Sequence, residues 1–302
     1  MSKPIYSETQ AAQPKTGGQK QIADRFAELR KEGNILRNAR VYLSGPMDFV
    51  ASRKEEKELG WRNRVGQFLR EKFGTTVYDP WNKPGVEGLG DYGKEDEAST
   101  RNRQQWTYAV SRGGDRKRAK VCDQYWPTLH IDLRMTDTSD FLIAYCPTNI
   151  YSVGTVHEIV TARLQYKPVL FVTPHVTFPT YDKLKAHLKK KKDKEGLGLL
   201  DRLRKEAPLR DNPDAIPSMW YMALIDAHYF FDGFGFAEYR NEFGWGKGAL
   251  DQHEKRFPPQ RPLLPYLEAL NAAIPPKYDL ERKGYVDNVD WLVFKQSDKQ
   301  ES

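Results

Sequence analysis

The residues best placed to do chemistry form the run Gly154-Thr155-Val156-His157-Glu158, near the middle of the chain. A Gly-Thr turn that opens a helix would place Glu158 in the first helical turn, where backbone N–H groups stabilise a charged carboxylate. An ionised carboxylate at the edge of an open sheet can act as a nucleophile or as a base. The structural alternative is an acidic residue that only complements the helix dipole.

Site segments also follow three predicted strands, over residues 40–46, 75–78 and 141–145, the last of which leads into the loop 146–153. Because ligands bind outside the carboxyl ends of parallel strands, we expect the turns after these strands to border the same site as Glu158. An Asp-Pro turn that closes on itself explains Asp79 equally well without a ligand. The candidate binding residues are Ser44, Gly45, Pro46, Met47, Asp48, Asp79, Trp81 and Asn82 at these turns, and Gly154 and Thr155 at the helix.

The elements that would position these residues alternate between strands and helices. Short apolar runs predict strands over 40–46, 75–78, 141–145 and 169–173, and apolar residues at helical spacing predict helices over 53–73, 123–137 and 155–166. This alternation is typical of a parallel sheet with helices on both faces. The fold class we predict is therefore α/β, a doubly wound parallel sheet of the flavodoxin or Rossmann type.

The rest of the chain divides into three predicted parts around this α/β domain of residues 36–180. Residues 1–35 are predicted to form a flexible tail and a short helix, and residues 83–120 an insertion that becomes strongly basic. Residues 181–302 are predicted to form an appended, mainly helical and aromatic-rich extension, with helices over 181–204, 218–231 and 263–273. We interpret the glycine-rich stretch 233–248 as a packing loop rather than a phosphate cradle.

Composition narrows the class of protein. The chain has 302 residues, of which 39% are hydrophobic, enough for a substantial core, and its 48 basic and 41 acidic residues give a net charge of +7. The lysine-rich run 185–194 is typical of a solvated helix face. Nucleic-acid contact is the alternative, although no aromatic residues interleave with the lysines.

Several motifs that would indicate other functions are missing. A Gly-x-Gly-x-x-Gly run after the first strand and a P-loop are both absent, so neither common nucleotide fingerprint is present. Cys122 and Cys146 stand apart, which excludes a disulfide framework and argues against a zinc site. The polar N-terminus and the lack of a long apolar stretch predict a soluble, cytoplasmic protein with no membrane contact.

Taken in order, the motifs resemble those of the nucleoside 2-deoxyribosyltransferase superfamily. The resemblance spans roughly Arg40 to Thr173, less than half of the chain. It is carried by Tyr42-Leu43-Ser44-Gly45-Pro46, Asp79-Pro80, Asp132-Leu133, Ser139-Asp140, Gly154-Thr155-x-x-Glu158 and Lys167-Pro168-Val169. Each motif is weak alone, but their order and spacing together are fairly specific.

The resemblance implies a role for three residues. Glu158 would be the nucleophile, Tyr42 would position that carboxylate and the sugar, and Asp132 would contact the nucleobase and help to protonate it. The family also implies a homo-oligomer and no metal or organic cofactor. The loop 148–153 lacks the acidic residue that the family's transferases often carry there, a departure that leaves the substrate open.

The expected reaction is cleavage of the N-glycosidic bond of a (deoxy)nucleoside and transfer of the (deoxy)ribosyl group to another base. A carboxylate can capture the oxocarbenium-like carbon, and a second carboxyl group can protonate the departing base. One alternative is a nucleoside 5′-monophosphate N-glycosidase, with residues 101–120 supplying phosphate contacts. Further alternatives are a non-catalytic nucleotide- or nucleic-acid-binding protein and cleavage of a dinucleotide.

Overall fold

A parallel sheet forms the centre of the molecule. The computed structural model describes residues 36–37, 39–47, 53–82, 107, 110–116, 129–207, 210–271, 276–279 and 284–287. Within them five strands pair in the order β2-β1-β3-β4-β5, and every pair is parallel. The strands are β1 (Arg40–Ser44), β2 (Thr76–Tyr78), β3 (Phe141–Tyr145), β4 (Val169–Val172) and β5 (Phe230–Phe231). The predicted doubly wound α/β fold is confirmed, with the flavodoxin-type strand order.

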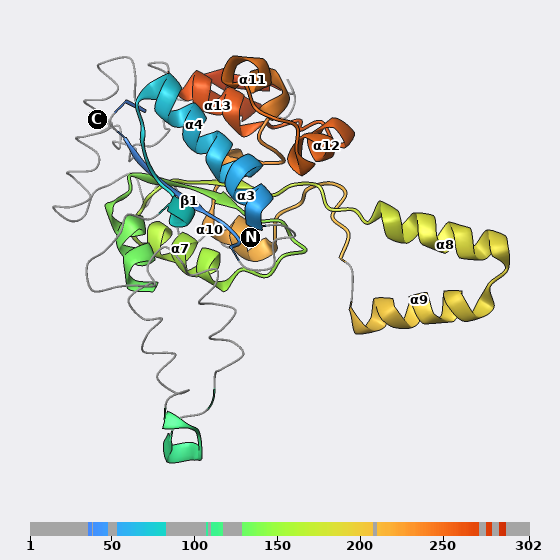
Figure 1. Cartoon of the computed structure of the whole chain (residues 1–302). Coiled ribbons are helices and arrows are strands. Elements are labelled where there is room, and N and C mark those ends of the chain that lie inside the picture. Colours follow the sequence, from blue (N-terminus) through green and yellow to red (C-terminus); the bar gives the residue numbers. More distant parts are fainter. Residues whose placement is uncertain are drawn as a thin grey trace, which may run out of the picture.

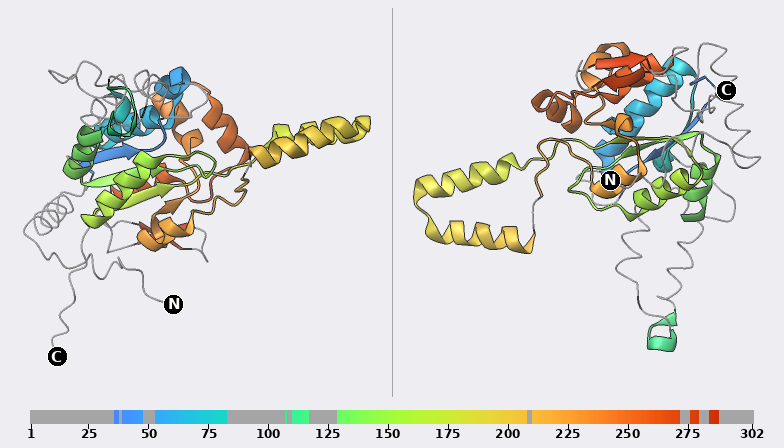
Figure 2. Two further views of the ribbon diagram at one scale, coloured as in Figure 1. Left: turned by 90° about the horizontal axis from the view of Figure 1, so that it is seen from below. Right: turned by 180° about the vertical axis from the view of Figure 1, so that it is seen from behind.

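Helices cover both faces of this sheet (Figures 1 and 2). One face carries α3 (Arg53–Leu59), α4 (Trp61–Phe73), α11 (Phe236–Phe243), α12 (Ala249–Arg256) and α13 (Leu263–Leu270). The other face carries α7 (Val153–Leu164), α10 (Met219–Leu224) and the helical residues 129–138. Because both faces are covered, β3 and β4 are built almost wholly from buried apolar residues.

Three predicted helices are interrupted or cut short in the structure. The helix predicted over 53–73 is broken at Gly60, where a Cβ atom would lie 2.1 Å from the carbonyl oxygen of Glu56. The prediction of a helix over 218–231 is wrong for its second half, since α10 ends at Leu224. The apolar run that follows forms η3 (Ala227–Tyr229) and then β5, in which Phe230 pairs with Phe171 of β4. Aromatic residues pack well on a pleated surface, which explains the strand. The segment expected as a C-terminal extension therefore supplies the fifth strand.

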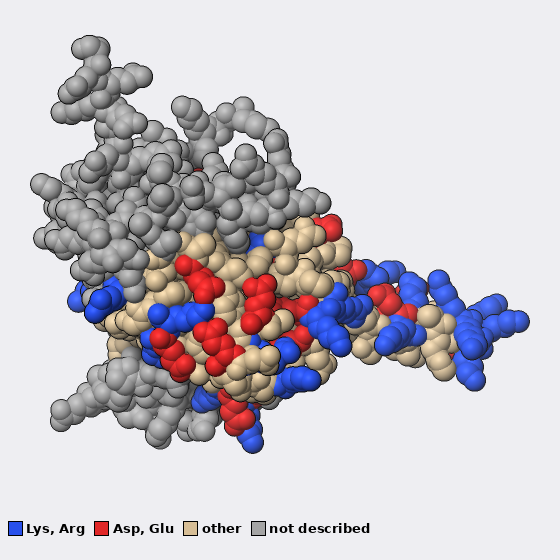
Figure 3. Space-filling model, turned by 90° about the horizontal axis from the view of Figure 1, so that it is seen from above, with Lys and Arg blue, Asp and Glu red and all other residues tan. Residues whose placement is uncertain are grey.

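The basic segment predicted as one helix over 181–204 is a hairpin of two helices, α8 (Pro179–Lys191) and α9 (Lys194–Glu206). The chain turns at Lys192, which has a left-handed backbone with φ 55°, and α9 starts where Asp193 accepts a hydrogen bond from the N–H of Gly196 at 2.8 Å. The hairpin projects from the body, and lysine and arginine cover much of its surface (Figures 2 and 3).

The remaining described elements are short. They are the 3-10 turns η1 (Pro80–Asn82) and η2 (Val110–Arg112) and the antiparallel pair β6 (Pro276–Asp279) and β7 (Gly284–Asp287). None of the helices in the described ranges combines the length and apolar character needed to cross a bilayer.

Candidate functional site

The carboxylate of Glu158 accepts hydrogen bonds from two hydroxyl groups of β1. The Tyr42 hydroxyl donates to Oε1 at 2.8 Å, and the Ser44 hydroxyl donates to Oε2. Tyr42 and Ser44 are fully buried, and Glu158 is 8% exposed. Strand β1 lies between β2 and β3, and the strand order reverses direction between β1 and β3. An open sheet of this type binds ligands at the carboxyl ends of the strands at this switch point, which is where these groups meet.

The way Glu158 is held differs from the prediction. Helix α7 begins at Val153, two residues earlier than expected, with Ser152 at the N-cap. The Ser152 and Thr155 hydroxyl groups hydrogen-bond at 2.6 Å and so tie the cap to the first turn. Glu158 consequently lies in the second turn, where the side-chain hydroxyls of Tyr42 and Ser44 donate to its carboxylate.

Tyr42 is fixed in its protonated form. Burial raises the pKa of its phenol well above the ordinary value, and the negative charges of Glu158 and Asp132 raise this pKa further. The positive charge of Arg62 opposes the shift without cancelling it. The hydroxyl therefore remains a donor to the carboxylate over the whole physiological pH range.

Sequence reasoning missed Arg62, which holds the turn after β1. Its buried guanidinium donates to the carbonyl oxygens of Leu43 at 3.2 Å, Gly45 at 2.6 Å and Pro46 at 3.2 Å. Its sequence signal was a charged residue within the buried stripe of α4. Gly45 fits here because a Cβ atom would lie 2.9 Å from Cζ2 of Trp61. The predicted Ser-Gly-Pro turn thus has a specific steric requirement at its glycine.

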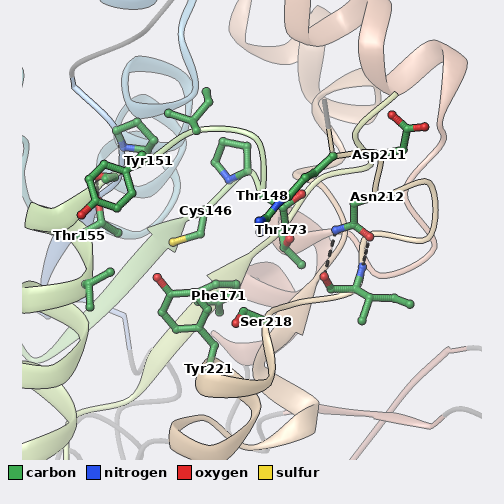
Figure 4. Close-up of a pocket in the computed structure, with 17 residues that line it drawn as sticks. Cys146, Thr148, Tyr151, Thr155, Phe171, Thr173, Asp211, Asn212, Ser218 and Tyr221 are labelled. Carbon is green, nitrogen blue, oxygen red and sulfur yellow. Dashed lines mark hydrogen bonds between the residues drawn. The ribbon is translucent and has the colours of Figure 1, made fainter. Parts of the chain in front are cut away.

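A cavity of about 390 Å³ opens beside this constellation, at the carboxyl ends of β3 and β4 (Figure 4). Two predicted site residues, Pro46 and Thr155, line it. Of the other polar lining residues, those of the loop 146–153 were expected at this site, and those beyond it were not predicted; they are Cys146, Thr148, Tyr151 and Ser152, and then Thr173, Arg210, Asp211, Asn212, Ser218 and Tyr221. They follow β3 and β4 or belong to residues 210–221, a segment that the sequence pattern did not connect to the sheet.

Cys146 connects the cavity to Glu158. It lines the cavity, and its thiol pKa is raised first by burial and then by the nearby Glu158 carboxylate. The Tyr221 hydroxyl hydrogen-bonds to this thiol. The Tyr221 ring packs on Phe171, with ring centroids 4.5 Å apart. The cavity therefore lies close to the Glu158 carboxylate, which does not itself line it.

The predicted residues after β2 are placed differently. Asp79 accepts a hydrogen bond from the N–H of Trp81 at 2.9 Å and so closes its own turn. The Trp81 ring is buried, with the Lys57 ammonium 5.3 Å from its centroid. Neither residue lines the cavity described above. The side chain of Asn82 lies outside the described part of the chain.

Four further predicted residues complete the survey. Asp132 lies in the helical residues 129–138, close enough for its charge to act on Tyr42. Met47 is half-buried after β1, and Asp48 lies outside the described residues. Gly154 is exposed in the first turn of α7, where a Cβ atom would meet nothing within 4 Å, so close packing does not require a glycine there.

Two of the motifs that carry the family resemblance have structural roles. The Lys167 ammonium donates to the carbonyl oxygens of Thr136 and Asp137 at the end of a helix, and burial lowers its pKa to about 8. Asp140 accepts from the backbone N–H of Arg40 at 2.7 Å and pairs with its guanidinium at 3.0 Å. Asp140 thus ties β1, which carries Tyr42, to the start of β3, and Lys167 ties the chain after α7, which carries Glu158, to the helical residues 129–138.

The backbone N–H groups of the glycine-rich stretch bind a carboxylate of the protein itself. The buried Glu254 carboxylate accepts from the backbone N–H groups of Phe234 at 2.7 Å, Gly235 at 3.1 Å and Phe236 at 2.9 Å. These are the donors that a phosphate cradle would need, and they already have a partner. Among the described residues, no group of three or more histidine, cysteine, aspartate or glutamate side chains could hold a metal ion.

Comparison with known proteins gives little to add. No protein-family profile matches the chain, and no curated protein matches it. A solved 2-deoxyribosyltransferase from the psychrotolerant bacterium Bacillus psychrosaccharolyticus is 18% identical over 47% of this chain and 79% of its own, with a TM-score of 0.28. A conserved protein from Enterococcus faecalis V583 is 16% identical over 55% and 87%, with a TM-score of 0.26. At these TM-scores neither likeness bears on what this chain does.

Proposed function

We propose that this chain cleaves the N-glycosidic bond of a (deoxy)nucleoside and transfers the (deoxy)ribosyl group to another base. The observation that carries the proposal is the buried Glu158 carboxylate, held by the Tyr42 and Ser44 hydroxyls beside a cavity. Donors at both oxygens fix the orientation of the carboxylate. It is oriented before the substrate arrives, which lowers the entropy cost of attack.

In the first step, a Glu158 oxygen attacks the anomeric carbon while the bond from that carbon to the base nitrogen breaks. The bonding electrons leave with the base, and Asp132 supplies a proton to it. The glycosyl ester of Glu158 that remains is neutral at the former carboxylate. In the second step, a nitrogen of another base attacks the same carbon, the ester bond breaks, and the incoming base returns a proton to Asp132.

Tyr42 and Ser44 have a positioning role in this scheme. Each hydroxyl donates to one Glu158 oxygen, so together they fix the rotation of the carboxylate about its last bond. They also moderate its nucleophilicity, and their bonds weaken as the carboxylate becomes an ester and strengthen again as it is released. The raised pKa of Tyr42 keeps this donor protonated throughout the cycle.

The decisive experiment is a chromatographic assay of a nucleoside panel, with and without a second free base, using wild type and Glu158→Gln. The proposal expects base exchange by the wild type and loss of exchange in the variant, with an intact-mass gain of one glycosyl group on the wild type when no acceptor is present. Release of free sugar without exchange would make the protein a hydrolase. No base release from any substrate would end the proposal.

The homo-oligomer implied by the family resemblance stays a prediction. Met219 and Trp220, at the start of α10, are more than four-fifths exposed and follow the cavity-lining Ser218. Apolar side chains this exposed are common at contacts between protein chains. Light scattering across a concentration series would measure the state of association.

A further inference from the structure

The hairpin of α8 and α9 takes no part in the proposed reaction. Figures 1 and 2 show it standing clear of the sheet and of the helices that cover the sheet. Its residues 179–206 include ten lysine and arginine residues and five aspartate and glutamate residues, so they carry a net charge of +5 out of +7 for the whole chain. A projection with this charge attracts an anionic partner.

Two contacts identify the sides on which the helices of the hairpin face each other. The Arg204 guanidinium of α9 lies over the Tyr181 ring of α8, 5.2 Å from its centroid, and Lys185 Nζ lies 3.7 Å from Asp201 Oδ1. Leu200, one turn before Arg204, is buried between the two helices. The facing sides are therefore occupied by the hairpin's own residues.

Three leucines remain outside this contact. Leu184 of α8 and Leu199 and Leu203 of α9 are between 45% and 56% exposed. At about 100° per residue, Leu184 is turned by about 60° from Tyr181, and Leu203 is turned by about 60° in the same sense from Leu200. Because the two helices are antiparallel, turns of the same sense point to the same side of the hairpin. The three leucines therefore share one side.

The same contacts place the leucines at one level along the hairpin. Leu184 lies between the two contacts on α8, and so it lies opposite the stretch from Asp201 to Arg204, which contains Leu203. Leu199 is one turn before Leu203 and lies on the same side of α9. We call these three residues the leucine face. Exposed apolar side chains gathered in this way are typical of a contact surface rather than of the scattered leucines of an ordinary protein surface.

The charge around the leucine face is unevenly shared. Helix α8 has five lysines and one aspartate, whereas α9 has four basic and three acidic residues. Two of the acidic residues, Glu195 and Glu206, are exposed about one turn before Leu199 and after Leu203. Duplex nucleic acid and an anionic lipid surface are negative throughout and would meet these carboxylates. A protein helix can place its own carboxylates toward α8 and uncharged or basic groups toward Glu195 and Glu206.

We propose that the hairpin is a docking surface for an acidic amphipathic helix of a partner protein. The apolar stripe of that helix packs on the leucine face, which gives the contact its affinity, and its carboxylates face the lysines of α8. These surface charges speed the encounter and make it sensitive to salt. The proposal is independent of the chemistry at Glu158.

The test measures binding of a synthetic helix to the full chain by calorimetry, with circular dichroism to follow helix formation. The probe is a peptide of about three heptads, with leucine at positions a and d and mostly glutamate and glutamine elsewhere. A second peptide has the same composition with its leucines spread around the helix, and a third has lysine in place of glutamate. The first peptide should bind and gain helix, and the other two should bind about tenfold more weakly or worse.

Variants of the hairpin separate the apolar and the electrostatic contributions. Changing both Leu199→Gln and Leu203→Gln should weaken binding of the first peptide by about tenfold or more, the scale of the apolar area of two leucines, while helix propensity is nearly kept. Leu164→Gln is the matched control, since Leu164 is exposed to a similar extent on α7. Changing both Lys190→Gln and Lys191→Gln should weaken binding and reduce its dependence on salt.

Three results would overturn the proposal. The first is equal binding of the leucine-stripe and the spread-leucine peptides, or binding that the leucine variant leaves unchanged. The second is tighter binding of duplex DNA, or of vesicles of phosphatidylcholine and phosphatidylserine, that is insensitive to the leucine variant, which would make the hairpin a purely electrostatic surface. The third is self-association of the wild type that the leucine variant abolishes, which would assign the leucine face to a second copy of this chain.

Discussion

Two glutamates of this protein are buried to the same extent and differ in everything else. Glu158 and Glu254 are each 8% exposed. Neither glutamate lines the cavity, but Glu158 is held by side-chain hydroxyls of another element and its charge acts on the cavity-lining Cys146. Glu254 is held by three successive backbone N–H groups. A carboxylate that completes the backbone hydrogen bonding of its own fold is structural. One that side chains of another element orient is the group to which the proposed function assigns the chemistry.

The pKa of Glu254 fits this structural role. Burial raises the pKa of the carboxyl group, and the bonds from Phe234, Gly235 and Phe236 offset part of the rise. The carboxylate therefore fixes the turn between β5 and α11, which in turn places Phe234 against Trp61 with ring centroids 5.6 Å apart. Glu254 thereby supports the packing of Trp61 under Gly45.

The largest effect we expect comes from exchanging each glutamate for glutamine. Glu158→Gln should lower kcat on the order of a thousandfold, because an amide cannot form the glycosyl ester. Its unfolding free energy should stay within about 1 kcal/mol, since the amide oxygen can still accept a hydrogen bond. Glu254→Gln should show the reverse, with kcat per folded molecule retained and stability lowered. Kinetics and thermal unfolding of the same preparations measure both. Equal loss of activity in the two variants would remove the distinction.

The next largest effect is on stability. Glu254→Ala removes the acceptor of three buried N–H groups and should cost roughly 2 to 4 kcal/mol, the range for leaving such donors unsatisfied. Denaturant unfolding measures this loss. Glu268→Ala is the matched control, since Glu268 is more exposed and accepts from side chains of Lys72 and Tyr239 instead. A loss of stability no greater than in this control would show that the turn from Phe234 to Phe236 does not depend on Glu254.

The sequence pattern predicted the parts of the site that a single element determines. Glu158, Tyr42 and Ser44 each follow from a motif on one helix or one strand, and the parallel sheet follows from alternating apolar runs. Arg62 could not be predicted in the same way, because its acceptors are backbone carbonyls, which the sequence does not mark. Its role depends on how closely α4 approaches the turn after β1.

The far wall of the cavity, formed by Thr173 and residues 210–221, was missed for a related reason. Thr173 and Tyr221 meet there only because β5 adds to the sheet and residues 210–221 fold back over the ends of β3 and β4. This path of the chain depends on the two-residue strand Phe230–Phe231. Local propensity cannot distinguish so short a strand from the end of a helix. Its pairing with β4, which is distant in the sequence, makes this segment a strand.

A smaller effect separates two tyrosines that each donate to a glutamate. Tyr42→Phe removes a hydrogen bond to Glu158 and should lower kcat about tenfold or more, as expected for a bond to a charged group. Tyr239→Phe removes a comparable bond to Glu268, 2.7 Å long and remote from the cavity, and should leave kcat unchanged. Because burial raises the pKa of Tyr42, the wild-type rate should show no loss from Tyr42 ionisation near pH 10. Equal kcat values for the two variants would contradict a positioning role.

The smallest effect compares two carboxylates of the same helix, α12. Burial opposes the charge of Asp251, but Arg64, the N–H of Gly248 and Arg240 together lower its pKa from 3.8 to about 2. A lowered folded-state pKa contributes stability above pH about 4 that is lost as the pH falls to about 2. Glu254 has the opposite sign, because its pKa is raised and protonation favours the folded state.

Acid unfolding can separate these two contributions. The stability difference between wild type and Asp251→Asn should narrow as the pH falls from about 4 to 2, because protonation removes from the wild type what the variant already lacks. The stability difference between wild type and Glu254→Gln should not narrow over this pH range, since the pKa of Glu254 is raised from its ordinary value. Urea unfolding at several pH values measures both differences. A gap for Asp251→Asn that stays constant down to pH 2 would mean that Arg64 and Arg240 do not hold this carboxylate ionised, and that the link from α4 to α12 depends on packing instead.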